Sequence, residues 1–104
     1  MIVTTTNEVP GKRFEILGLV MGNTVQSVHI GKDFLAGFKN LVGGEIAAYN
    51  EMLTNARQIA GDRMYQQAVS MGADAIVAIH FESNSVTQGA TEILAYGTAV
   101  KFID

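Results

Sequence analysis

Between residues 45 and 71 the apolar side chains recur every three or four positions. This spacing places them on one face of a helix. Gly72 follows the last apolar position, as is typical of a helix C-cap, and Gly61 interrupts the pattern where a helix can bend. The pattern predicts one long helix over residues 45–71, whose buried face is formed by Tyr49, Met52, Leu53, Ala56, Ile59, Ala60, Met64, Ala68 and Met71.

Residues 14–22, 74–82 and 92–103 are rich in apolar side chains but alternate little. Continuous apolar runs of this length are typical of strands that are buried on both faces. Residues 25–30 either continue the first strand or begin another after a turn at Gly22 and Asn23, and residues 2–4 predict a further short strand. Gly97, inside the last strand, predicts a bulge or a close backbone approach.

The segments between these elements carry turn and cap signals. Pro10 and Gly11 predict a turn within residues 7–12, and the polar residues 83–91 predict a loop between the last two strands. Residues 33–42 have the apolar spacing of a short helix, with Asp33 and Gly43 at its cap positions. The chain is therefore expected to form one α+β domain over residues 1–104, with helices on one face of a small antiparallel sheet.

This architecture predicts assembly. One helical layer covers only one face of the sheet, although two strands are apolar on both faces. The 27 predicted helical residues would span about 40 Å, whereas a compact domain of this length is about 33 Å across. Both mismatches are resolved if other subunits complete the packing.

The amino-acid composition also favours assembly, and it excludes several classes of protein. Charged residues make up 16% of the chain and apolar residues 48%, against the usual charged fraction of about 25%. The net charge of −3 and the scattered basic residues argue against a nucleic-acid partner. The chain has no cysteine, no apolar stretch long enough to span a membrane and no signal-peptide pattern at its start. We therefore expect a cytoplasmic protein.

The first candidate site is the start of the long helix. Gly43, Gly44 and Glu45 predict a helix start, although the same backbone amides can bind an anion. Arg57 lies beside the apolar face, where it is expected to extend to solvent or to pair with a carboxylate across a subunit boundary. Glu45, Tyr49 and Arg57 are the candidate ligand-binding residues, and no catalytic residue is assigned.

The second candidate site is a metal site at His80 and Glu82. These residues lie two apart on a predicted strand, so their side chains point to the same face. One strand supplies only two ligands, whereas a closed zinc site uses four. The alternative is a surface or interface histidine. A divalent metal is therefore the candidate cofactor of this site.

The residues Gly43-Gly44-Glu45, Tyr49, Arg57, Gly72-Ala73-Asp74-Ala75 and Tyr96-Gly97-Thr98-Ala99-Val100 resemble the YbjQ family of small bacterial and archaeal proteins. Its members often carry the label "putative heavy-metal-binding". The resemblance covers almost the whole chain. It implies a dodecin-like β-α-β-β subunit and a homopentameric ring, and it implies no reaction. With no cysteine and two histidines, the chain lacks the usual ligands of soft metals.

Three hypotheses follow. The leading one is a non-enzymatic homo-oligomer that binds a metal or small molecule near its subunit boundaries. The second is an enzyme with a composite site that includes Glu45, Tyr49 and Arg57. The third is a purely structural ring.

Overall fold

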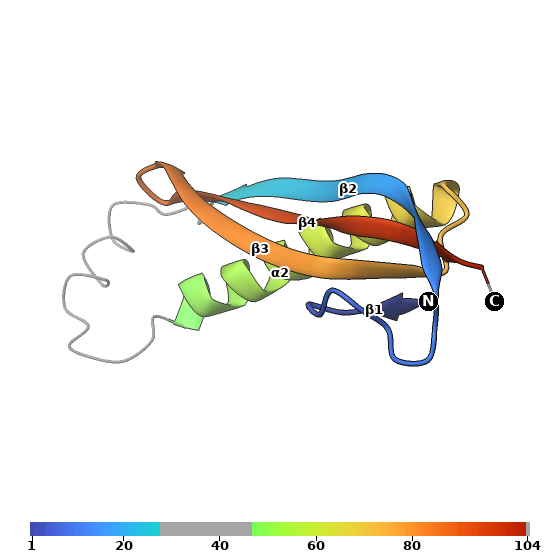
Figure 1. Ribbon diagram of the computed structural model, residues 1–104. Coiled ribbons are helices and arrows are strands. Elements are labelled where there is room, and N and C mark those ends of the chain that lie inside the picture. Colours follow the sequence, from blue (N-terminus) through green and yellow to red (C-terminus); the bar gives the residue numbers. More distant parts are fainter. Residues whose placement is uncertain (28–46, 104) are drawn as a thin grey trace.

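The computed structural model describes residues 1–27 and 47–103 (Figure 1). They form β1 (Ile2–Val3), β2 (Phe14–Ser27), α2 (Ala47–Ser70), β3 (Ala75–Thr87) and β4 (Ala90–Phe102). The predicted short helix over residues 33–42 and the predicted start of the long helix at Glu45 lie outside the described residues.

The strands form one sheet in the order β1-β3-β4-β2, and α2 runs along one of its faces (Figure 1). The three long strands are antiparallel, as predicted, but β1 pairs with β3 in parallel, so the sheet is mixed. A strand of two residues carries no pattern from which its direction could be predicted. The α+β class and the two layers are confirmed.

The core between helix and sheet is built from small side chains on the helix. Ala56, Ala60, Ala68 and Met64 are buried against the sheet, where Val20 of β2 is also fully buried. Alanines bring the helix axis close to the strands, where branched side chains such as Val20 and Ile76 fill the space beneath the helix. The predicted buried face of the helix is confirmed at these positions but is wrong at Met71, which lies beyond the helix end and is exposed.

Gly22 lies at the closest approach of β2 to α2. A Cβ atom at this position would collide with the carbonyl oxygen of Ala60 and the amide nitrogen of Met64. Glycine therefore lets the strand pass directly beneath the helix backbone. Of the two alternatives at Gly22 and Asn23, the continuous strand is confirmed and the turn is wrong, because β2 continues through both residues to Ser27.

The helix ends as the sequence predicts. The Ala73 amide donates to the Ala68 carbonyl at 3.1 Å, and the Gly72 amide donates to the Val69 carbonyl at 3.0 Å. These two bonds define a Schellman cap, whose central residue takes a positive φ. Gly72 has φ 76°, which glycine adopts without strain.

The predicted loop over residues 83–91 is also wrong. The strand β3 continues to Thr87, and β4 begins at Ala90, so only Gln88 and Gly89 connect them. Residues 82–88 are exposed on both faces of this hairpin end. Because both faces meet solvent, the sequence is polar apart from Val86 and lacks the alternation by which a strand is recognised.

Gly97 lies opposite a bulge in β3, as predicted. Ala78 and Ile79 together face it, and a Cβ at Gly97 would lie 2.9 Å from the Ile76 side chain and 3.0 Å from that of Ile79. The bulge turns its amides away from β4, so the Ala78 amide donates to the Thr6 carbonyl at 2.8 Å. The bulge thereby anchors the segment that follows β1.

That segment covers one end of the sheet face that lies away from α2, which we call the open face. Its Val9 packs with Ala75, Val77 and Val100 in a second small core. The Lys12 amide donates to the Val9 carbonyl at 3.1 Å, which closes the turn predicted at Pro10 and Gly11. Beyond this covered end, the open face is exposed.

The outer edge of β2 is closed by helix side chains. The Met21 amide donates to Gln67 Oε1 at 2.7 Å, and Arg63 Nη1 donates to the Asn23 carbonyl at 2.7 Å. Unpaired groups on an edge strand otherwise invite another strand to pair with them. The middle of the β2 edge is therefore blocked against strand addition.

Candidate functional site

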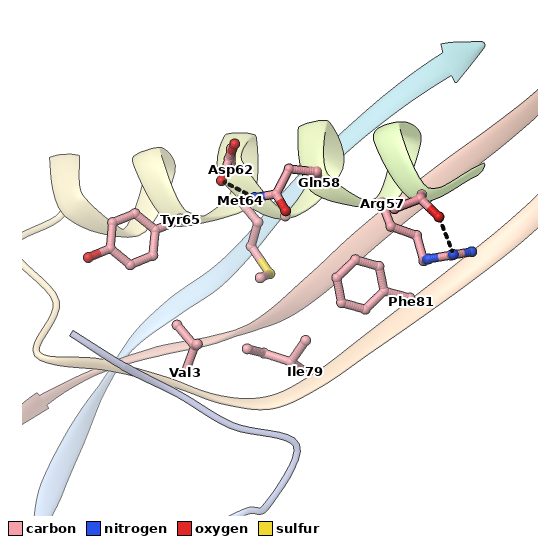
Figure 2. Close-up of a pocket in the computed structure, with 10 residues that line it drawn as sticks. Val3, Arg57, Gln58, Asp62, Met64, Tyr65, Ile79 and Phe81 are labelled. Carbon is pink, nitrogen blue, oxygen red and sulfur yellow. Dashed lines mark hydrogen bonds between the residues drawn. The ribbon is translucent and has the colours of Figure 1, made fainter. Parts of the chain in front are cut away.

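A groove of about 430 Å³ runs between α2, β3 and the short strand β1 (Figure 2). It forms because α2 packs mainly over β2 and β4 and makes few contacts with the neighbouring strand β3, whose Phe81 is left exposed on the helix side. The volume is within the range of small-molecule sites. Its lining residues are Val3, Thr54, Arg57, Gln58, Gly61, Asp62, Met64, Tyr65, Ile79 and Phe81.

The groove has an apolar base. Met64 and Ile79 are 3% and 6% exposed, and the Met64 side chain points from the helix toward Ile79 (Figure 2). Phe81 is 48% exposed, although it is an aromatic residue on the helix side of the sheet. Met64 and Ile79 therefore close the bottom of the groove, and Phe81 offers apolar surface that nothing in the described part of the chain covers.

Arg57 supplies a positive charge at the end of the groove where Phe81 lies (Figure 2). Its side chain is exposed, and its Nη2 donates to the Thr54 hydroxyl at 3.3 Å. Within residues 1–27 and 47–103, no carboxylate lies within ion-pair distance of this guanidinium. Among the described residues, the charge is therefore available to an anion in the groove.

The other polar residues of the groove mostly bond along the helix. Gln58 Nε2 donates to Asp62 Oδ1 at 3.3 Å, one turn further on (Figure 2). Tyr65 lies at the end of the groove away from Arg57 (Figure 2). The groove can thus hold a molecule with an apolar body and an anionic group at the Arg57 end.

Gly61 lies in the middle of the helical wall of the groove. A Cβ atom there would meet only the Phe81 ring, at 3.6 Å from Cζ, which is ordinary van der Waals contact. Glycine inside a helix is less stable than alanine by about 1 kcal/mol. Unlike Gly22 and Gly97, Gly61 has no steric reason to be glycine in the described residues. The helix also continues through it from Ala47 to Ser70.

The predicted ligand residues are only partly brought together. Arg57 lines the groove, but Tyr49 does not. Eight residues separate them on α2, which is about 12 Å along the helix axis. Tyr49 is half-buried near the start of the described helix, and Glu45 lies outside the described residues.

The predicted metal residues lie on the open face. His80 and Tyr96 are cross-strand partners whose rings stack with 5.6 Å between centroids. The Tyr96 hydroxyl donates to Glu82 Oε1 at 3.4 Å, so this tyrosine contacts both predicted ligands. Across the part of the chain that the structure describes, no three histidine, cysteine, aspartate or glutamate side chains come together as a metal site.

Sequence reasoning missed Phe81, Ile79 and Gly61 as groove residues. Gly61 interrupts the helical pattern of the sequence. A bend in the helix and a groove beside it would both produce this interruption. Phe81 was visible as an apolar residue on a strand that is apolar on both faces. The part of β3 that the helix leaves exposed depends on how α2 crosses the sheet. The local spacing of apolar residues in the sequence does not determine this crossing.

Among the described helices, none has the length and apolar character to cross a membrane.

Comparison with known proteins gives whole-chain matches. The YbjQ family model, described as "putative heavy-metal-binding", matches residues 1–103. A UPF0145 protein of Vibrio parahaemolyticus is 56% identical over 105 residues and covers 100% of both chains. Another from Thermotoga petrophila is 58% identical over 102 residues, which is 97% of this chain and 96% of that protein.

Among solved structures, this chain is similar to a protein of unknown function from Pediococcus pentosaceus, assigned to the DUF74 family. The TM-score is 0.63 at 13% identity, and the match covers 98% of this chain and 97% of that one. At this identity the likeness concerns the fold alone.

Proposed function

This chain belongs to the YbjQ family, and from that premise we propose that it is a homo-oligomeric binding module, not an enzyme. Its subunits assemble through the open face of the sheet. It binds a small ligand or a metal ion near the subunit boundaries, and it acts in the cytoplasm. The absence of cysteine fits such a reducing compartment.

One observation carries the proposal: a row of exposed apolar side chains along β2. Ile16, Leu19, Val25 and Met21 are 71%, 61%, 55% and 44% exposed. The intervening Val20 packs against α2, so Leu19, Met21 and Val25 point to the open face. Together the four expose about 400 Å² of apolar surface, an area that in soluble proteins marks an interaction site.

Burial of this surface is worth a large free energy. At about 25 cal/mol per Å², 400 Å² contributes on the order of 10 kcal/mol before the costs of association. A whole domain of this size is stable by about 5–15 kcal/mol. Because Gln67 and Arg63 block the middle of the β2 edge, contact through the open face is favoured over strand addition there. Closed rotational symmetry satisfies such a surface in every subunit, and the family resemblance favours five subunits.

The shape of the subunit supports the same proposal. Its radius of gyration is 17.5 Å, whereas a compact domain of this length has about 13 Å. The long β3–β4 hairpin and β2 extend the molecule along one axis, so each subunit has much surface for its size.

A metal ion is the second candidate ligand, and the family description favours it. His80 and Glu82 are both exposed on the open face and both contact Tyr96. A neighbouring subunit that docks on this face would bring further donors. The isolated pair supplies two ligands of the four that a closed zinc site uses.

The enzymatic alternative, with Glu45, Tyr49 and Arg57 in a composite site, has less support. Tyr49 and Arg57 lie about two helical turns apart, and only Arg57 faces the groove. A neighbouring subunit would have to supply the rest of the catalytic groups.

Native mass spectrometry of the protein purified from its own host tests the proposal. We expect a closed oligomer that carries additional mass, either a small organic molecule or a metal ion. A monomer without bound mass would refute both parts of the proposal. An oligomer that turns over a co-purified compound would favour the enzymatic alternative.

A further inference from the structure

The groove between α2 and β3 has three features that together define a class of ligand. An exposed aromatic wall, Phe81, stands beside an available cation, Arg57, at the same end of the groove (Figure 2). The buried Met64 and Ile79 form an apolar base. Between them the backbone of the helix is bare at Gly61.

Gly61 is the most informative of these features. A glycine inside a helix needs a reason, because alanine would make the helix more stable. The fold supplies that reason at Gly22, where a Cβ would strike the helix backbone, but at Gly61 the nearest atom lies at 3.6 Å. A bare backbone is used where a ligand approaches closely. The place that a side chain at Gly61 would take is bordered by the Phe81 ring, so the glycine leaves this part of the groove free for a ligand.

We propose that this groove binds a small planar organic acid, with its carboxylate at Arg57 and its ring against Phe81 and the bare backbone at Gly61. The guanidinium presents a planar pair of donors that matches a carboxylate. An exposed phenylalanine ring favours an offset-stacked aromatic partner, and the Met64 thioether is a favourable neighbour for such a ring. The site lies within one subunit, on the helix side of the sheet. The inference rests on the binding module proposed above, but it places the ligand in the groove of each subunit and not at the boundary formed by the open face.

Fluorescence titration with 2-naphthoate tests this assignment, with 2-naphthamide and octanoate as matched probes. The amide has the same ring without the charge, and octanoate has the charge without the ring. We expect naphthoate to bind saturably, and both other probes to bind at least ~10-fold more weakly, because each lacks one of the two recognised groups. Equal binding of naphthoate and naphthamide, or no saturable naphthoate binding at millimolar concentration, would overturn the proposal.

Variants of the groove locate the binding. Arg57→Gln should weaken naphthoate binding at least ~10-fold, and Arg57→Lys should weaken it less because the charge remains. Gly61→Leu should abolish binding by filling the groove. Asn55→Leu is the matched control, since it adds the same side chain to an exposed position of the same helix outside the groove, and it should bind as wild type does.

Gly61→Ala keeps the test decisive if the leucine variant does not fold. This substitution should raise the melting temperature and weaken naphthoate binding at the same time. A purely structural glycine would change stability and leave binding unchanged, which would contradict the assignment.

Sedimentation of the same variants separates this inference from the proposed function. If Gly61→Leu changes the mass of the assembly, the groove is a subunit contact and the ligand assignment is wrong. If the assembly stays intact and naphthoate binding is unaffected by every groove variant, the binding module stands but this site does not.

Discussion

Replacing Gly22 by alanine is the most severe test of how β2 and α2 pack. The added methyl group would collide with the Ala60 carbonyl oxygen and the Met64 amide nitrogen and would lie 2.7 Å from the Arg63 Cβ. Backbone atoms of a helix cannot move singly, since each is tied into the hydrogen-bond ladder. The whole helix must therefore retreat by about 1 Å to restore contacts of 3.5–4.0 Å.

Such a retreat separates the buried alanines of α2 from the sheet. Overpacking of a core costs 1–3 kcal/mol, and a clash with backbone belongs at the upper end, at about 3 kcal/mol. Alanine also lowers the conformational entropy of the unfolded chain, which offsets about 0.4–1 kcal/mol of this loss in stability. A net loss of about 2–3 kcal/mol lowers the melting temperature of a domain of this size by roughly 10 °C or more.

Urea unfolding followed by circular dichroism measures this change, at one fixed protein concentration because assembly links stability to concentration. Gly61→Ala is the matched control. It makes the same substitution on α2 itself, on the flank that faces Phe81, where the nearest atom is at 3.6 Å, and should raise stability by up to about 1 kcal/mol. If Gly22→Ala unfolds within 0.5 kcal/mol of wild type, the packing of α2 on β2 described above is wrong.

Three further predictions concern the surface. The double substitution Gln67→Ala and Arg63→Ala frees two outward backbone groups of β2. Light scattering should therefore detect larger aggregates than in wild type, and unchanged scattering would refute the edge-blocking role. Asp74→Ala removes a carboxylate that accepts from the Phe102 amide at 2.8 Å and should lower the free energy of unfolding by about 1.5–3 kcal/mol in urea, whereas a loss below 0.5 would contradict this. Calorimetric titration of tag-free protein with zinc, copper and nickel should give no sub-micromolar site, and a tight stoichiometric site that disappears in His80→Ala would restore metal as the ligand.

The elements that the sequence predicts well are those whose signal is local. The apolar period of α2, the cap at Gly72 and the turn at Pro10 and Gly11 each depend on residues within one or two turns of chain. The bulge opposite Gly97 was also predicted, because a glycine within an apolar strand indicates a close approach whatever makes it.

The errors have a common physical origin. At Gly22 the sequence left a turn and a continuous strand open, and the strand is formed because a helix 38 or more residues away in sequence packs there. At residues 83–87 both faces of the strand meet solvent, so the pattern is that of a loop. The groove depends on the crossing of α2 over β2 and β4, and this tertiary feature left Phe81 and Gly61 unassigned.

Sedimentation equilibrium of the full chain at micromolar concentration tests the central claim, that the open face of the sheet is a subunit interface. We expect a closed oligomer, preferentially of five subunits, and Leu19→Asp on that face should shift the equilibrium toward smaller species. A compact, cooperatively folded monomer of 11.1 kDa would contradict the claim and the architecture of the proposed module.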